Sequence, residues 1–554
     1  MNWILGCFLG FVILCLIANR TQSKRQREAL ISLFTKQCGQ KNTRTLSAKE
    51  LEMIKAYSDF RKEDSGLDKI TWTDLQLDRI FQSLAYTQSS MGDEILYWYL
   101  RFPRMEQEEL EKREKIISYF QHTPEKRLQM QLLFHRIGRS KQYSLVQYLE
   151  KCEGFQGISL LPHILGDTAL IISIVLLFIQ LPIGLLCCFF SLLYNLLTYF
   201  KTKGELDLYA GSIGYVFRTI ESGKKMVSLL PEEFQTDKEA IDKILDSLTF
   251  FHPLWLWLVG GEGMKGDFFS VLLDYVRMFT HVDLFLGFLL VKQMQDSKQD
   301  LYRLIETMGQ YDACIAIGLY RQSVEFYCIP DFSDTNNKQI ENAYHPLLEH
   351  PVANSVPLEQ SILLTGSNAS GKSTFLKTLG VNMVLSQTIH TCLAKSYQMP
   401  LVTVFTSLAV QDSLEKGESY YIAEIKAILR MFQMDTEGIQ KVCILDEVLR
   451  GTNTIERVSA ASQILKSMSE DNILCIAATH DLELTELLKE NWKQYHFEES
   501  IVEKEIRFSY EIKEGKANTR NAIALLEQMG YGKDIVESAR ELAKNFEEKG
   551  LYFS

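Results

Sequence analysis

The residues best suited to chemistry lie in one glycine-rich loop, LLTGSNASGKST, which runs from Leu363 to Thr374. Its glycines, lysine and serine fit the pattern G-x-x-x-x-G-K-[ST]. Small residues let backbone N–H groups reach phosphate oxygens, the lysine reaches the β and γ phosphates, and the serine hydroxyl ligates magnesium. The pattern predicts a site for a nucleoside triphosphate with Mg²⁺. Its phosphate-binding residues would be Gly366, Ser367, Ala369, Ser370, Gly371, Lys372, Ser373 and Thr374.

Two adjacent carboxylates follow a second aliphatic segment, Lys441 to Leu445. A buried strand here would deliver Asp446 to its carboxyl end, where the carboxylate can hold Mg²⁺ through water. Glu447, one residue further, can polarise the attacking water as a general base. The alternative is a strand that ends in two solvated acids. The phosphate-binding loop upstream favours the catalytic interpretation.

A histidine follows a third aliphatic segment, Ile473 to Ala478. Ligand sites of open α/β sheets lie at the carboxyl ends of the strands. His480 is therefore placed to sense the γ-phosphate through a hydrogen bond. A purely structural histidine after a strand is the alternative.

These side chains need a sheet to bring them together, and the chain from about Ser323 onward has the pattern of one. Short aliphatic segments alternate with helical stretches, which predicts a mainly parallel sheet covered by helices. The predicted strands are residues 362–364, 401–405, 442–445 and 473–478. Period-two alternation over residues 501–513 predicts a late strand or hairpin, and residues 520–549 read as an amphipathic helix. Residues 28–156 and 203–322 are helical in pattern.

The net charge and the cysteine spacing limit the kinds of partner and of cellular compartment that suit this chain. The 554 residues carry a net charge of −11, which gives no support for a protein that binds nucleic acid over its whole surface. The net charge does not exclude a local basic groove that binds nucleic acid. The 11 cysteines show no C-x-x-C spacing, and several lie in the most apolar stretches. This usage is typical of free thiols serving as small hydrophobes in a reducing compartment.

Two apolar stretches predict membrane segments. The first, residues 4–18, is followed by Arg20, Lys24, Arg25 and Arg27, so residues 1–19 predict an anchor with the following chain in the cytoplasm. The second runs from Thr168 to Phe200 and is interrupted at Pro182 and Gly184. A helical hairpin that turns at Pro182–Gly184 fits best. The alternative is a buried helical pair in a soluble core.

Three segments together resemble the MutS family of DNA mismatch-repair ATPases, a branch of the ABC-type ATPases. They are the loop TGSNASGKST, Asp446-Glu447 leading into RGTNT at 450–454, and ATH at 478–480. Residues 412–424 are similar to the signature region of that family. The resemblance implies that Ser419 contacts the γ-phosphate held by a second subunit, so the active form would be a homodimer. It also implies ATP and Mg²⁺ as cofactors, with Asn368 beside the phosphates.

The resemblance extends, more weakly, into the helical part. Leu77-Asp78 and the segment from Ser90-Met91-Gly92 to Pro103 look like the opening of the family's core helical domain. Residues 310–313, QYDA, resemble the point where its lever helices return to the ATPase. The expected fold class is an α/β ATPase domain of the ABC-type P-loop kind, C-terminal to an all-α core and lever domain with transmembrane helices. The expected domains are an anchor (1–19), a cytoplasmic helical domain (20–157), a transmembrane hairpin (158–202), a helical lever (203–322) and the ATPase (323–554).

Three departures from the family limit what carries over. Only a short segment separates the anchor from Leu77, so the N-terminal mismatch-reading domain has no room. The hairpin lies inside the helical core, near where the family's DNA clamp would extend. The segment from His345 to Asn354 has proline where an aromatic residue stacking on the base would be expected.

The sequence therefore predicts a multi-pass protein of the cell membrane with a cytoplasmic, dimeric, MutS-like ATPase, acting on DNA in mismatch repair or damage sensing. The DNA role rests on the resemblance alone. The alternative is a membrane-associated ABC-type ATPase that is coupled to a membrane or protein partner and has no nucleic-acid role.

Overall fold

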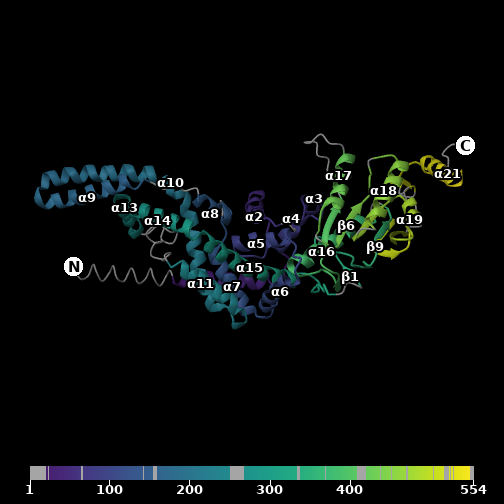
Figure 1. Cartoon of the computed structure of the whole chain (residues 1–554), viewed down its shortest axis with the longest axis horizontal. Coiled ribbons are helices and arrows are strands. Elements are labelled where there is room, and N and C mark those ends of the chain that lie inside the picture. The colour runs from purple at the N-terminus through teal and green to yellow at the C-terminus, as the bar shows by residue number, and fades with distance from the viewer. Residues whose placement is uncertain are drawn as a thin grey trace. The chain divides into compact units, whose positions relative to one another are not determined.

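The structure is a computed structural model of the whole chain (Figure 1). It describes residues 20–549 apart from 23, 64–65, 141–142, 154–158, 250–267, 334–336, 368–369, 409–419, 437, 451, 470–471, 503–504, 517–522, 524–525 and 528. The predicted anchor at residues 1–19 and Ser419 lie outside the described residues. The chain forms two compact units. We call residues 1–62, 85–98 and 116–320 the helical unit, and residues 63–84, 99–115 and 321–554 the sheet unit.

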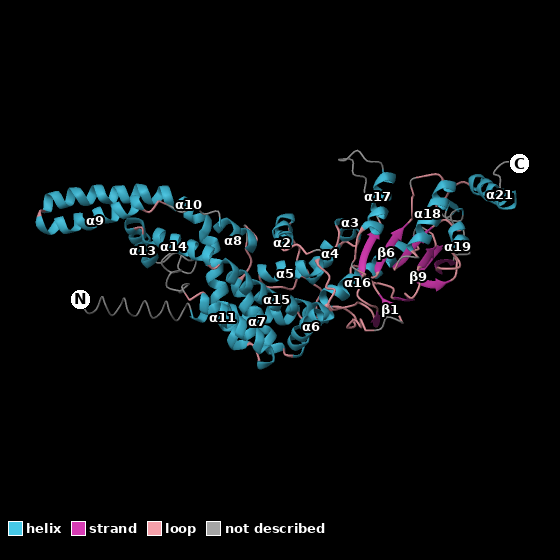
Figure 2. Cartoon of the chain, in the orientation of Figure 1, coloured by secondary structure: helices cyan, strands magenta, loops and turns pink. Residues whose placement is uncertain are grey.

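Strands occur only in the sheet unit among the described residues (Figure 2). A six-stranded sheet has the order β5-β6-β7-β3-β8-β9, in which all neighbours are parallel except β8 and β9. Its strands are β3 (Ile362–Thr365), β5 (Thr403–Ser407), β6 (Lys441–Asp446), β7 (Ile473–Thr479), β8 (Lys493–Val502) and β9 (Glu505–Glu514). A smaller sheet contains β1 (Gln339–Ala343), β2 (Asn354–Pro357) and β4 (Ser396–Gln398). The α/β expectation is confirmed, and each of the four predicted aliphatic segments forms a strand.

Helices accompany the strands in the alternation that the sequence predicts. They are α16 (Lys372–Ile389), α17 (Tyr420–Gln433), α18 (Thr454–Met468), α19 (Glu483–Leu487) and α21 (Lys533–Lys549). One buried cluster joins the middle strands to α17, α18 and α19, with Leu363 on β3, Cys443 on β6 and Cys475 on β7 fully covered. Burial on both faces explains why β3, β6 and β7 are continuous aliphatic runs rather than alternating ones.

A segment from the first fifth of the chain completes the sheet unit. Helix α3 (Lys69–Asp74), purple in Figure 1, lies beside the edge strand β5. The Thr71 hydroxyl accepts from Thr406 N at 3.1 Å, and Asp74 accepts from the Thr406 hydroxyl at 2.8 Å. Arg430 donates to Thr406 O at 2.7 Å. Thr71 and Arg430 thus bind the backbone N–H and C=O of Thr406, which an edge strand would otherwise leave open for pairing with another chain.

The helical unit is built from α2 (Ala48–Phe60), α7 (Pro124–Ile137), α8 (Leu145–Glu153), α9 (Leu161–Ile179), α10 (Leu181–Leu229), α11 (Gln235–Ser247), α13 (Phe268–Thr280), α14 (Val282–Asp296) and α15 (Lys298–Ser323, whose last residues pass into the sheet unit). The helices α4 (Leu77–Leu84), α5 (Ser90–Arg101) and α6 (Gln107–His122) lie in the segments through which the chain passes between the two units.

A buried carboxylate joins two segments that the sequence analysis singled out separately. Asp312 of α15 accepts from Gln88 N at 3.1 Å, from Ser89 N at 2.9 Å and from the Ser89 hydroxyl at 2.6 Å. Gly92 lies against the same carboxylate, since a Cβ there would stand 2.2 Å from Asp312 Oδ2. Asp312 thus caps the start of α5 from a position more than 200 residues further along the chain.

This carboxylate is expected to make the helical unit pH-sensitive. Burial raises the pKa of Asp312 from 3.8 to about 6. Because the folded state then binds the proton more tightly, this group's contribution to stability is full below pH 4 and is lost as the pH rises through 6, a change of about 3 kcal/mol. Relative to wild type, Asp312→Asn should gain stability as the pH rises from 4 to 7. Thermal melts of both chains at several pH values measure the difference; a pH-independent difference would contradict the prediction.

The helices α9 and α10 run side by side as a hairpin (Figure 1). They meet at Gln180, slightly before the predicted turn, because Pro182 is accommodated in the first turn of α10, where a proline costs no intrahelical hydrogen bond. Within the described residues, Leu161–Ile179 and Leu181–Gly204 are long and apolar enough to cross a membrane, by length and composition. Only 22% and 17% of their most apolar windows are buried.

Polar contacts fasten the open end of this hairpin to the corner between α13 and α14. His281, which has a left-handed backbone, contacts Asp167 of α9 at 2.8 Å. Asn195 of α10 donates to Phe279 O at 2.8 Å, and Lys203 pairs with the buried Asp283 at 2.8 Å. Charged and hydrogen-bonding groups therefore join this end of the hairpin to the corner between α13 and α14, while the part nearer the turn at Gln180 is mostly apolar.

Candidate nucleotide-binding site

The glycine-rich loop connects β3 to α16, as its flanking sequence predicts. Gly366 and Gly371 have φ values of 144° and 105°, which residues other than glycine rarely adopt. Lys372, the first residue of α16, folds its side chain back so that Nζ donates to Gly366 O and Ser367 O at 2.7 Å each. The ammonium group and the N-terminus of α16 together place positive charge at one point, which suits an anion.

Parallel register brings the two predicted magnesium residues together. Ser373 Oγ donates to Asp446 Oδ2 at 2.5 Å, joining the start of α16 to the end of β6. Burial raises the pKa of Asp446, while the hydrogen bond from Ser373 opposes that rise. A hydroxyl and a carboxylate in contact are oxygen ligands of the kind that Mg²⁺ prefers. The two residues fit the cation that a nucleotide would bring.

The predicted base and the predicted phosphate sensor are also in contact. Glu447 Oε1 lies 2.7 Å from His480 Nε2, and the same histidine nitrogen lies 3.4 Å from Lys372 Nζ. The hydrogen bond with His480 is the main cause that lowers the pKa of Glu447, so the carboxylate is ionised at neutral pH. A general base has to be ionised in this way before it accepts a proton.

The backbone that carries Glu447 is unusual, and a buried carboxylate supports it. Glu447 and Leu449 have positive φ values of 56° and 60°. Glu424 of α17, only 4% exposed, accepts from Leu449 N at 2.5 Å and from Arg450 N at 3.1 Å. Glu424 is the last residue of the segment 412–424 that resembles the signature region, and its residue type alone predicts no role. It is a positioning residue, because it joins α17, which begins within that segment, to the loop that holds Glu447.

A cavity of about 330 Å³ opens beside the loop and could hold the nucleoside part of a nucleotide. The predicted base-side segment 345–354 contributes several side chains, and strands β8 and β9 supply aromatic ones. The lining residues are Ala343, His345, Leu348, His350, Val352, Asn354, Gly371, Thr374, Phe375, Thr378, Phe497 and Tyr510. Burial lowers the pKa of His345 to about 4, so this imidazole is neutral.

Tyr510 brings an aromatic ring to this cavity. Its φ is 56°, and its ring stacks on Phe508 with centroids 5.9 Å apart. Asn354 holds it in place, donating to Tyr510 O at 2.9 Å and accepting from Ile512 N at 2.8 Å. Residue 510 lies far from the loop in sequence, so only the fold places its ring against Gly371.

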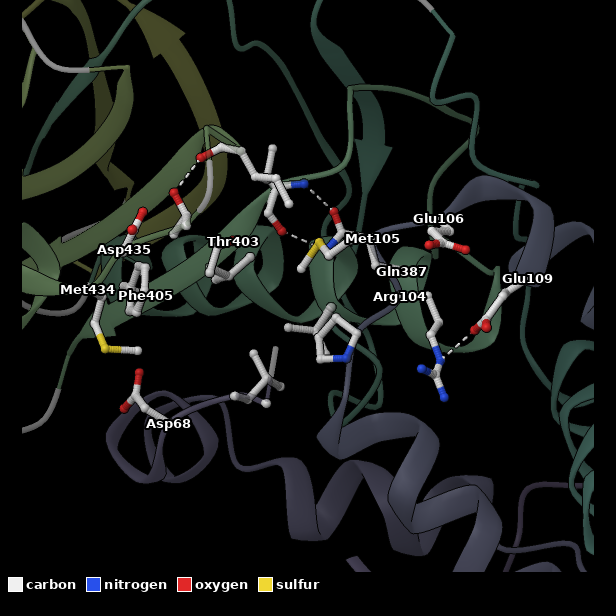
Figure 3. Close-up of a pocket in the computed structure, with 18 residues that line it drawn as sticks. Asp68, Arg104, Met105, Glu106, Glu109, Gln387, Thr403, Phe405, Met434 and Asp435 are labelled. Carbon is white, nitrogen blue, oxygen red and sulfur yellow. Dashed lines mark hydrogen bonds and ion pairs between the residues drawn. The ribbon is translucent and has the colours of Figure 1, made fainter. Parts of the chain in front are cut away.

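A second cavity, of about 410 Å³, lies at the amino end of β5, away from the loop (Figure 3). Arg104 and Glu109 form an ion pair at one side of it, and Asp68, Met434 and Asp435 lie at the other. Gln387 clamps the chain just before β5 by bonding both Val402 N and Val402 O. No described residue of the glycine-rich loop lines this cavity.

The structure thus brings together Lys372, Ser373, Asp446, Glu447 and His480 at the carboxyl ends of β3, β6 and β7. Gly366, Ser367, Ser370, Gly371 and Thr374 lie in the same loop and at the start of α16. Asn368, Ala369 and Ser419 fall outside the described residues.

The segment that carries these residues is similar in sequence to known proteins. Residues 362–547 match the family model described as MutS domain V. The part of the chain that carries the site is therefore similar to MutS domain V. The chain is 29% identical over 274 residues to the DNA mismatch repair protein MutS of Aquifex pyrophilus, covering 46% of the chain and 32% of the relative. The corresponding protein of Leptospira interrogans is 31% identical over 277 residues, covering 47% and 32%. The chain spans about a third of the length of these curated relatives.

Proposed function

We propose that this chain binds ATP with Mg²⁺ and hydrolyses it. The observation that carries the proposal is the contact of Glu447 with His480 and of His480 with Lys372. A nucleophile-activating base, a γ-phosphate sensor and a phosphate-binding ammonium group meet there. Lys372 would exchange its bonds with Gly366 O and Ser367 O for bonds to phosphate oxygens, and Ser373 with Asp446 would hold Mg²⁺. Glu447 would orient and deprotonate the attacking water.

The catalytic unit proposed here is a homodimer. MutS-family resemblance gives Ser419 to the γ-phosphate of the opposite subunit, and Glu424 supplies a physical link from that region to the base within one subunit. Closure of two chains around ATP would then act on Leu449 and Arg450 through α17. ATP-dependent dimerisation, measured by light scattering, tests the idea; monomers at saturating ATP and turnover independent of protein concentration would refute it.

The nucleoside part of ATP is proposed to stack on Tyr510. Removing the ring by Tyr510→Ala should weaken ATP binding about tenfold or more, since base–aromatic stacking contributes about 1–3 kcal/mol. Tyr510→Phe keeps the ring and should bind like wild type. Titration with a fluorescent ATP analogue gives both affinities. Equal losses in the two variants would show that the hydroxyl, rather than stacking, is what matters.

Membrane attachment through the α9–α10 hairpin is a further part of the proposal. The exposure of its apolar side chains supports it, with Phe178 at 88% and Ile179 at 70%. A soluble protein would not leave so large an apolar surface in water. Cys187 and Cys188 of α10 are natural reporters of this surface. In intact membranes they should resist an aqueous maleimide and react once denaturing detergent is added; labelling in intact membranes would contradict insertion.

We propose that the ATPase acts on DNA, in mismatch repair or damage sensing. The names of the curated MutS relatives support this assignment. The alternative, a membrane or protein partner without nucleic acid, is favoured by the hairpin within the helical unit. ATPase assays in detergent with duplex, mismatched and branched DNA, repeated at several salt concentrations, discriminate the two. Stimulation by one DNA structure supports the DNA role, and absence of binding at low salt with and without ATP supports the alternative.

A further inference from the structure

Two pairs of cysteines face each other across neighbouring extended segments of the sheet unit. Cys328 and Cys392 form an antiparallel bridge in which each N–H donates to the carbonyl of the other, at 2.9 and 3.0 Å. Cys443 of β6 and Cys475 of β7 are neighbours in parallel register. All four are free thiols. The two pairs differ in geometry and in access to solvent.

The geometry of the first pair suits a covalent bond. In an antiparallel pair with both hydrogen bonds, the two Cα atoms are about 5.5 Å apart and the side chains leave the same face. Disulfides most often join Cα atoms about 5.5–6 Å apart. The expected Cα separation of Cys328 and Cys392 is therefore within the range that a disulfide joins.

Reactivity also separates the pairs. Cys328 is half-buried, and its interaction with the Cys392 thiol lowers its pKa, which increases the share of reactive thiolate. Cys392 is fully buried, and its Sγ lies 3.4 Å from Asn382 Oδ1. Cys443 and Cys475 are both fully buried, and burial raises the pKa of each thiol. The second pair therefore lacks both an accessible sulfur and a thiolate.

We infer that Cys328 and Cys392 form an oxidisable dithiol site whose oxidant is a low-molecular-weight disulfide of the glutathione type. The Cys328 thiolate attacks one sulfur of the oxidant, forming a mixed disulfide and releasing one glutathione thiolate. The Cys392 sulfur then attacks Cys328 Sγ, gives its proton to solvent, and expels the second glutathione thiolate. Two protein thiols are oxidised to one disulfide, and one oxidised glutathione is reduced to two thiols.

The bond would close a loop that contains β1, β2, β3, the glycine-rich loop and all of α16. Cys392 lies just after α16, the helix that begins with Lys372. Oxidation would therefore tie the far end of the phosphate-binding helix to the segment that follows α15. Because a cross-link restricts the unfolded chain, the oxidised sheet unit should be more stable than the reduced one.

The test uses the full-length chain in detergent, reduced, freed of reductant and then incubated with oxidised glutathione. Peptide mapping without reductant should find Cys328 linked to Cys392, with a melting temperature higher by about 5 °C that dithiothreitol reverses. Cys443→Ser is the matched control and should link equally well. Cys392→Ser should stop at a glutathione adduct on Cys328, and Cys328→Ser should yield neither product.

Three outcomes would overturn the inference, and all are read on wild-type protein, so they do not depend on a variant folding. One is a stable glutathione adduct on Cys328 that never proceeds to the linked product. Another is linkage that appears only in denaturant. The third is linkage of Cys443 to Cys475 at the same rate. None of these results bears on ATP hydrolysis, so the two proposals fail separately.

Discussion

Replacing Glu447 by glutamine is expected to stop ATP turnover and to leave ATP binding intact. Glutamine keeps the shape of the side chain and can still hydrogen-bond His480 Nε2, which lies 2.7 Å from the carboxylate. It cannot accept a proton from water, because the amide is not basic. General base catalysis contributes about 10²–10⁴-fold, so turnover should fall by about 100-fold or more.

The measurement is phosphate release at saturating ATP, paired with a titration of ATP binding in the absence of turnover. Glu490→Gln is the matched control, because Glu490 is exposed and precedes β8 near the amino end of β3, opposite the end that carries the phosphate-binding loop. It should behave like wild type. Wild-type turnover in Glu447→Gln would mean that another group activates the water. Loss of binding in that variant would mean that Glu447 positions the nucleotide rather than the water.

The largest loss of stability is expected for Gly92→Ala in the helical unit. The new Cβ would stand 2.2 Å from Asp312 Oδ2 and 2.6 Å from its Cγ, far inside van der Waals contact. Asp312 cannot move aside without weakening its bonds to Gln88 N and Ser89 N. Overpacking together with weakened hydrogen bonds should lower the free energy of unfolding by about 2–3 kcal/mol.

Gly204→Ala is the control for this substitution, because a Cβ at residue 204 would meet no heavy atom within 4 Å. Gly204 is also within a helix, α10, where alanine is favoured over glycine by about 0.5–1 kcal/mol, so this variant should be as stable as wild type or slightly more so. Urea denaturation followed by tryptophan fluorescence compares the three chains. A Gly92→Ala midpoint equal to that of wild type would rule out the tight packing of α5 against Asp312.

Much of the candidate site was accessible from sequence because its signals are local. A loop of fixed spacing between an aliphatic strand and a helix predicts its own geometry, and the fold places Lys372 and Ser373 accordingly. Asp446, Glu447 and His480 each follow a buried strand. Parallel pairing with small register offsets then brings the strand ends to one edge. The α/β class follows from the same alternation.

Other features of the site depend on contacts between residues distant in sequence, which no local pattern encodes. Glu424 supports the Glu447 backbone from α17, and Tyr510 reaches the loop from β9. The covering of β5 by α3 joins residues more than 300 positions apart. Polar and aromatic residues of these types occur throughout the chain, so their roles appear only when the tertiary structure sets their neighbours.

The sequence by itself determined the strand–loop–helix that carries the proposed nucleotide site, the residue types in it, and the apolar segments around residues 168–200. Each of these is set by spacing and hydrophobicity over short stretches. The tertiary structure alone decided that residues 63–84 and 99–115 pack with the sheet, that Asp312 caps α5, and that Cys328 faces Cys392. These outcomes depend on burial, because a carboxylate, a glycine or a thiol acquires its role only from the groups that exclude water around it.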